Sequence, residues 1–287
     1  MNLKPDLSIL DESFDKKALS HYHISLQFGF DEFSFCILDT KRNKYIALES
    51  YHFEGFHDYP ALCENIKDMI LKNALLQNKY KSVSASIVHN RATLIPAALF
   101  EKSNEKNYLL FNHSLEKDED IATDKLNSID SLNLYALPDC VESTLKEAFP
   151  AIKIYHHSSH LIEGLLIQYK NQNDKKLVIH YRSGYFDIVA LNGKDLILYN
   201  FFNCRTKEDF VYYILFVCEQ LKLNPENLNL VLAGEIEKKS DYYSLLYKYI
   251  RNISFGERSD RLEYSYLLDE VPKQFYYNLF NQYLCVS

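Results

Sequence analysis

The 287-residue sequence contains no tryptophan and only seven glycines, whereas glycine makes up about 7% of an average protein. It also lacks an excess of basic charge, because 32 Lys and Arg face 39 Asp and Glu. Surfaces that bind nucleic acid are basic, so the net charge of −7 argues against a nucleic-acid partner. Scarce glycine limits the loops in which a backbone can approach a phosphate closely.

Signals for export and for membrane insertion are also absent from the sequence. Residues 1–15 carry four acidic side chains and no apolar stretch, so no signal peptide is expected. The longest dense apolar run, residues 210–218, is too short to span a bilayer. None of the six cysteines forms a C-x-x-C pair, which predicts buried free thiols. We therefore expect a cytoplasmic protein.

After residues 1–20, which we interpret as a leader, the pattern predicts three short strands joined by tight turns, at 23–28, 33–39 and 45–53. Asp58 and Pro60 suit the start of a helix, and apolar residues then recur at helical spacing through residue 78. A buried strand is expected at 83–88.

The middle of the chain is more polar, and its pattern predicts strands and helices that alternate as in parallel α/β units. We expect a helix within 101–112, an acidic loop at 115–124, strands at 132–137 and 152–156, and helices at 139–149 and 159–169.

The pattern of three strands, a helix and a strand then returns. The strands are predicted at 177–181, 185–191 and 196–202, followed by a helix at 207–222 and a strand at 228–232. That helix is apolar nearly all round, so we expect it to be buried on several sides. The polar stretch 171–176 is the best boundary between the two passages.

The two passages match element for element. Their first strands begin 153 residues apart (24 and 177), their helices 148 apart (59 and 207), and their last strands 146 apart (83 and 229). A β-β-β-α-β unit is that of the ribonuclease H-like fold, and two copies predict an α/β, actin-like, two-lobed protein with a mixed sheet in each lobe. We expect a leader at 1–20, lobe I at 21–172 and lobe II at 173–287.

Three segments resemble a bacterial family of unknown function whose fold is actin-like: HISLQFGFDEFSFCILD, LIPAALFEKSNEKNYLLFNH and LVLAGEI. The resemblance covers residues 20–285. It implies a fold and a place for a site, because actin-like ATPases hold Mg-ATP between one hairpin turn of each lobe and a glycine-bearing loop near the adenosine.

Carried over residue by residue, the resemblance points to five cofactor-binding positions in an interlobe cleft: Gly29, Asp31, Arg182, Gly184 and Gly234. The metal-holding Asp of the family pattern is replaced by Gln27 in the first hairpin and by His180 in the second. ATP and magnesium are therefore disfavoured as cofactors, because Mg-ATP would lose its main electrostatic clamp.

Each of these residues also has a structural interpretation that stays open. Gly29 and Gly184 suit hairpin turns, and Gly234 suits a turn after a strand. Asp31 is typical of a solvated turn, and Arg182 of a surface ion pair.

The sequence also lacks the motifs of several other kinds of enzyme. Neither first strand carries the clustered carboxylates of a ribonuclease H-type nuclease. No nucleophile elbow, Walker or Rossmann motif is present. In His156-His157-Ser158-Ser159-His160, adjacent strand residues should point to opposite faces, so a serine that caps the helix is favoured over a metal site. We expect neither a catalytic residue nor a metal ligand.

Nine tyrosines crowd residues 242–283, and tyrosine favours both packing and protein interfaces. Two hypotheses follow. A non-catalytic actin-fold protein would bind a protein partner through the cleft or the Tyr-rich C-terminal lobe. Alternatively, an ATPase or phosphotransferase would use the divergent interlobe site. The sequence leaves open whether the chain is an enzyme, although the missing carboxylates favour the first hypothesis.

Overall fold

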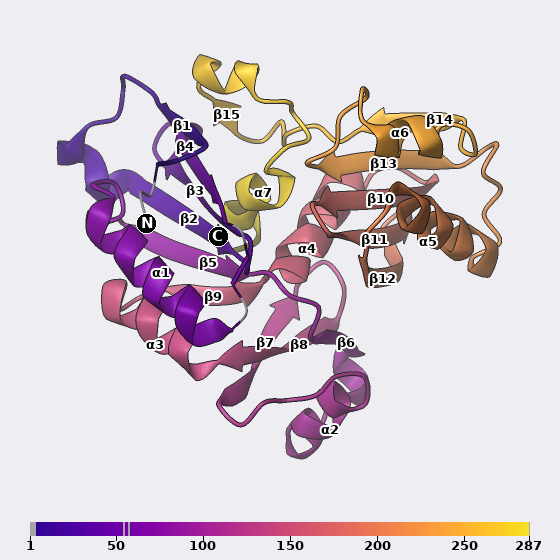
Figure 1. The fold of residues 1–287 in the computed structure, drawn as a ribbon, viewed down its shortest axis with the longest axis horizontal. Helices are drawn as coiled ribbons and strands as arrows, with labels where there is room; N and C mark the ends of the chain where they lie inside the picture. Colours follow the sequence, from indigo (N-terminus) through magenta and orange to yellow (C-terminus); the bar gives the residue numbers. More distant parts are fainter. Residues whose placement is uncertain (1–3, 54, 57, 287) are drawn as a thin grey trace. The chain divides into compact units, whose positions relative to one another are not determined.

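A computed structural model describes residues 4–53, 55–56 and 58–286, and its contacts divide the chain into two compact units (Figure 1). Unit 1 comprises residues 1–160, 260–270 and 279–287, and unit 2 comprises 161–259 and 271–278. The lobes predicted from sequence met at residues 172 and 173. The division between the units falls after His160, and residues 260–270 and 279–287 belong to unit 1. The lobe bounds stay a prediction.

The main sheet of unit 1 contains the predicted meander. Strands β2 (Tyr22–Phe28), β3 (Glu32–Asp39) and β4 (Lys44–His52) pair antiparallel, and β5 (Ser82–Ile87) lies parallel to β2. The strand order is β1-β4-β3-β2-β5-β9, and the short β15 (Glu263–Tyr264) also pairs with β4. Between β4 and β5, helix α1 (Tyr59–Lys72) begins at Asp58, whose carboxylate accepts the Ala61 amide at 2.8 Å.

The segment interpreted as a leader contains part of this sheet. Strand β1 (Leu7–Leu10) pairs antiparallel with β4, and a 3₁₀ helix (Lys16–His21) then leads into β2. The end of the chain also packs on unit 1, through the 3₁₀ helix Tyr266–Glu270 and the last turns of α7 (Tyr277–Val286). Tyr45 on β4 donates its hydroxyl to the Phe280 carbonyl of α7 at 2.5 Å.

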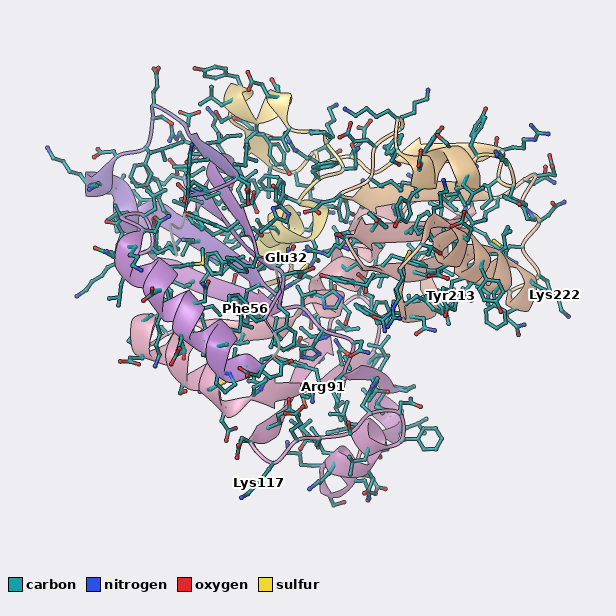
Figure 2. The ribbon with its side chains drawn as sticks, in the orientation of Figure 1. Glu32, Phe56, Arg91, Lys117, Tyr213 and Lys222 are labelled. Carbon is teal, nitrogen blue, oxygen red and sulfur yellow. The ribbon has the colours of Figure 1, made fainter. Side chains whose placement is uncertain are left out.

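Residues 88–138 form a second, smaller sheet rather than part of a parallel α/β succession. β6 (Ala92–Pro96) and β7 (Glu119–Leu126) both pair antiparallel with β8 (Ser131–Pro138). The segment 115–124, predicted as an acidic loop, therefore belongs to strand β7 from Glu119 onward. The predicted helix within 101–112 is confirmed as α2 (Glu105–Leu110), preceded by the 3₁₀ segments Ala97–Leu99 and Lys102–Asn104. Arg91, labelled in Figure 2, forms an ion pair with Glu119 of β7.

The chain then returns to the main sheet of unit 1. Helix α3 (Asp139–Ala148) lies against α1, and β9 (Lys153–His156) adds to the main sheet parallel to β5. Helix α4 (His157–Tyr169) follows without a loop, and the division between the units falls within it.

Unit 2 repeats the meander. Strands β10 (Lys175–Arg182), β11 (Tyr185–Asn192) and β12 (Asp195–Asn203) pair antiparallel, and β13 (Asn229–Gly234) lies parallel to β10. The order β12-β11-β10-β13-β14 ends with β14 (Asn252–Phe255), and α6 (Asp241–Leu246) precedes β14. The order β4-β3-β2-β5 in unit 1 matches β12-β11-β10-β13, so the predicted repeat and fold class are confirmed.

Helix α5 (Lys207–Gln220) connects β12 to β13 and starts with a capping box between Thr206 and Asp209. Its inner side joins the core of unit 2 through residues such as Phe210, Ile214 and Val217. The prediction that this helix is buried on several sides is wrong for one side, because Tyr212 is 62% and Phe216 43% exposed.

In the part of the chain that the structure describes, no helix combines the length and apolarity needed to cross a membrane.

Candidate functional site

The predicted site residues of unit 1 lie where its parallel strands end. β2, β5 and β9 run parallel, and their carboxyl ends meet at one edge of the sheet. Open α/β sheets bind ligands outside this edge, because the loops there connect strands to helices and leave backbone groups exposed. Loops begin at this edge at Gly29 and Val88, and after β9 the chain passes directly into α4 at His157.

Gly29 and Asp31 lie together in the turn between β2 and β3. The Gly29 amide donates to the Glu32 carbonyl at 3.0 Å, which closes the turn. A Cβ built on Gly29 would lie 3.5 Å from Asp31 Oδ1 and from Val88 Cβ, an ordinary contact distance. The backbone of Gly29 therefore does not require glycine, and a phosphate-binding role for this residue stays a prediction.

Arg182 and Gly184 lie in the corresponding hairpin of unit 2. Arg182 ends β10 and is in register with Tyr185, so Ser183 and Gly184 form a two-residue loop. Gly184 has a φ of +89°, which favours glycine, and open space surrounds the position of a Cβ. Arg182 is buried, so the alternative of a surface ion pair does not describe it.

Gly234 ends β13 beside the end of β10 and is required by close packing. Its φ is +79°, and a Cβ would lie only 2.1 Å from the Tyr181 carbonyl oxygen. The Gly234 amide donates to the Gln274 carbonyl at 2.8 Å, and the Glu235 amide donates to Tyr181 at 2.9 Å. The structural role of Gly234 therefore accounts for the glycine without a ligand.

The two positions at which the family pattern expects a metal-holding Asp are buried inside the strands. Gln27 lies within β2 and has no exposed surface. His180 lies within β10, where its Nδ1 is 3.3 Å from Asp187 Oδ2 on β11, and Asp187 Oδ1 accepts the Tyr199 hydroxyl at 2.8 Å. The nearby carboxylate of Asp187 is therefore engaged by His180 of β10 and by Tyr199 of β12.

Sequence reasoning missed a cluster of buried polar residues beside the Gly29 turn, where β7, β8 and the start of α4 meet. It is defined by six residues from segments far apart in the chain: His89, Asp124, Asn133, His156, Ser158 and Ser159. We call it the α4 cluster. Only His156, Ser158 and Ser159 are neighbours in sequence, so no short motif could have revealed it.

Asp124 organises the α4 cluster. Its Oδ2 accepts the His156 amide at 2.9 Å and the Ser159 hydroxyl at 2.5 Å. Burial raises the pKa of this carboxyl to about 7, although the bonds from Ser159 and the His156 amide act in the opposite direction. Asn133 donates to the hydroxyls of both serines, at 2.9 and 2.8 Å.

Three histidines of this region, His89, His156 and His160, are held by hydrogen bonds to neighbouring groups. His156 lies between the Ser158 hydroxyl at 2.7 Å and the His89 carbonyl at 2.9 Å. Burial lowers the pKa of His89 to about 3, with further effects from Arg91 and His157. His160, whose Nδ1 is 2.6 Å from the Ser86 hydroxyl, also has its pKa lowered to about 3 by burial. The neutral rings of His89 and His160 can therefore donate or accept hydrogen bonds, but they carry no positive charge that could bind a phosphate.

Two details of the sequence reasoning about the histidine motif were wrong. The rings of His156 and His157 do not diverge, since their centroids are 4.4 Å apart where the chain turns from β9 into α4. Ser158 and Ser159 lie inside the helix and bind Asn133 and Asp124 rather than capping it. Within residues 4–53, 55–56 and 58–286, no group of three or more His, Cys, Asp or Glu could hold a metal.

The tyrosines near the C-terminus differ in burial and are divided between the two units. Tyr243 and Tyr277 are buried, and Tyr243 stacks on Phe255 with a centroid distance of 5.7 Å. Tyr247 and Tyr249 are about half exposed in unit 2, whereas the exposed Tyr266 belongs to unit 1.

A family of proteins described as "Protein of unknown function (DUF3822)" matches residues 11–253 of the chain. A crystal structure from Bacteroides thetaiotaomicron, a protein with an actin-like ATPase fold and unknown function, is 27% identical. The match has a TM-score of 0.77 and covers 85% of this chain and 93% of that chain. A comparison with functionally curated proteins finds no match.

Two more distant structures share the fold. A chain of the PilM–PilN type IV pilus biogenesis complex is 14% identical with a TM-score of 0.58, over 92% of this chain and 98% of that one. The ethanolamine utilization protein EutJ from Carboxydothermus hydrogenoformans is 9% identical with a TM-score of 0.50, over 90% and 89%.

Alanine substitutions at Gly29, Gly184 and Gly234 test how far packing and backbone conformation require glycine at each position. Gly234→Ala should reduce the free energy of unfolding by more than about 3 kcal/mol, because its Cβ overlaps the Tyr181 carbonyl. Gly184→Ala should cost roughly 1 kcal/mol for its positive φ, and Gly29→Ala less than about 0.5 kcal/mol. Urea unfolding measures all three. A Gly234→Ala protein as stable as Gly184→Ala would contradict the packing argument.

The stability difference between wild type and Asp124→Asn should depend on pH. The folded carboxyl, with a pKa of about 7, keeps a proton that the unfolded chain releases near 3.8. The protonated Asp124 carboxyl contributes fully to the free energy of unfolding below about pH 4, and this contribution is lost as the pH rises through about 7. Wild type should therefore lose roughly 4 kcal/mol relative to Asp124→Asn between pH 4 and 8. Asp120→Asn, at an exposed position of the same strand, is the control in urea titrations. A pH-independent difference would show that folding leaves the pKa of Asp124 at its unfolded value.

Proposed function

The chain belongs to the DUF3822 family of proteins of unknown function, and we propose that it is a non-catalytic actin-fold protein that binds a protein partner. In this proposal the exposed side of α5 in unit 2 is the partner-binding surface. Fold alone does not imply function, so the proposal is argued from particular residues.

The residues at the expected metal positions support a non-catalytic role. Gln27 is a neutral amide inside β2, and an amide does not supply the negative charge that holds Mg²⁺ beside a triphosphate. His180 is held by Asp187 on the neighbouring strand. In addition, packing alone accounts for the glycine at position 234, because a Cβ there would lie 2.1 Å from the Tyr181 carbonyl oxygen.

The observation that carries the proposal is a pair of aromatic side chains exposed on α5. Tyr212 and Phe216 are one helical turn apart, 62% and 43% exposed, and their rings stack with a centroid distance of 6.3 Å. Large exposed aromatic side chains are costly to leave in water and are enriched in protein interfaces. A stacked pair on a regular helix forms a rigid anchor, which loses little entropy when a partner covers it.

A layer of aromatic side chains supports this pair from below. Tyr213, labelled in Figure 2, stacks on Phe202 of β12 with a centroid distance of 4.7 Å and contacts the Tyr212 ring at 5.3 Å. The pair lies between Glu208 and Glu219, one helical turn before and after it. The complementary partner segment would thus be apolar at its centre and basic at its ends.

The PilM–PilN complex is an assembly in which a protein of this fold occurs together with a protein partner. Its 14% identity carries the fold only, so the partner and surface proposed for this chain rest on α5 itself.

Photo-crosslinking from α5 tests the proposed surface. With p-benzoylphenylalanine in place of Tyr212, irradiation in the native host should give one adduct of discrete mass. Adding Phe216→Glu should reduce that adduct by at least roughly tenfold, because a buried charge costs well over 1.4 kcal/mol of binding. Mass spectrometry of the adduct identifies the partner.

The control places the same crosslinker at Tyr266, which is 64% exposed but lies in unit 1. Equal adducts from positions 212 and 266, or adducts that survive Phe216→Glu, would rule out α5 as the surface.

One observation favours the alternative, an ATP-binding enzyme with a divergent site. Gly29, Asp31, Arg182, Gly184 and Gly234 all lie at or beside carboxyl ends of strands, where α/β sheets bind ligands. The two functions differ in a thermal-shift titration. If the protein does not bind nucleotide, millimolar Mg-ATP should leave the melting temperature within about 1 °C of its starting value. A rise of several degrees that Arg182→Ala abolishes would establish the alternative instead.

A further inference from the structure

Two cysteines that are 77 residues apart in the sequence lie in direct contact in unit 1. Cys63 on α1 and Cys140 on α3 have their Sγ atoms 2.9 Å apart. The sulfur atoms of a disulfide are about 2.05 Å apart, so a shift of roughly 0.9 Å would allow a covalent bond. We propose that Cys63 and Cys140 form an oxidative modification site, at which disulfide exchange with a small thiol disulfide cross-links α1 to α3.

The two helices hold the sulfurs in register. Below the cysteine pair, Lys67 of α1 reaches Glu147 of α3 with an Nζ–Oε2 distance of 3.9 Å. The second contact lies further toward the C-terminus on both helices, so α1 and α3 run parallel. Thr144, one turn after Cys140 and buried, also contacts Cys63. These contacts on the same two helices hold the Cys63 and Cys140 side chains against each other.

The other thiols have different surroundings. Cys36 donates to the Leu279 carbonyl at 3.8 Å, Cys204 to the Thr206 carbonyl at 3.1 Å, and Cys285 to the Asn281 carbonyl at 3.3 Å. Cys218 is buried in the core of unit 2. Cys63 and Cys140 are thus distinguished by thiol-to-thiol contact.

The environments of the two thiols assign the order of the steps. Cys63 is buried, and its burial together with the Cys140 contact raises its pKa to about 12. Cys140 is partly exposed near the start of α3. The Cys140 thiolate therefore attacks the small disulfide first, forms a mixed disulfide and releases one thiolate. Cys63 then loses its proton, attacks Cys140 Sγ and displaces the second thiolate.

The net reaction is balanced: the protein dithiol loses two protons and two electrons, and the small disulfide gains both as two free thiols. Cys63 keeps its proton until a high pH, so its attack on the mixed disulfide is the slow step. The cross-link should therefore form faster as the pH is raised.

Glutathione disulfide is the probe for this site. Wild-type protein incubated with it, then alkylated and digested without reductant, should give a linked peptide that contains Cys63 and Cys140. The melting temperature should rise by several degrees and return after reduction, because a bridge across so long a segment restricts the unfolded chain.

Variants make the outcome specific. Cys63→Ala should stop at a glutathione adduct on Cys140, and Cys140→Ala should give neither adduct nor link at these positions. Cys218→Ala is the matched control, a buried thiol of unit 2, and should still form the link. Full alkylation of Cys63 and Cys140 after oxidation, or a linked peptide between other cysteines, would overturn the proposal. If the wild-type protein forms the cross-link but its melting temperature does not change, the expected stabilisation by the bridge is contradicted.

Discussion

The parallel pairing of β2 with β5, and of β10 with β13, is the constraint on which the rest of the structure depends. Each pairing needs a helix to carry the chain back across the sheet, and it brings the carboxyl ends of the paired strands to one edge. The turn at Gly29 and the loop at Gly234 therefore have fixed places in their units. The same pairing brings the Gly234 backbone against the Tyr181 carbonyl, where no side chain fits.

A second constraint is that buried polar groups need partners. The small sheet packs beside the start of α4 through polar side chains, so Asp124, Asn133 and the serines of α4 satisfy one another there. Burial keeps His89 and His160 neutral, and it favours the protonated form of Asp124. A region of hydrogen-bonded, largely uncharged side chains is suited to holding these segments of unit 1 together.

Much of the fold could be predicted because each repeat carries a local signal. Short strand-like segments separated by tight turns indicated both meanders, and Asp58 marked the start of α1. The prediction was wrong where pairing partners decide the structure. The N-terminal segment became strand β1 because β4 offered a free edge, and β8 joined an antiparallel sheet rather than the parallel one. The exposed side of α5 was missed, because an apolar pattern does not say whether a neighbour covers it.

The sequence by itself determined the repeated secondary structure and the actin-like fold class, because these depend on residue type and local spacing. Only the tertiary structure decided which distant residues meet. It brought Asp124 to Ser159, left Tyr212 and Phe216 exposed as a pair, and placed Cys63 against Cys140. Such contacts arise from helix and strand packing across tens of residues, and no local pattern records them.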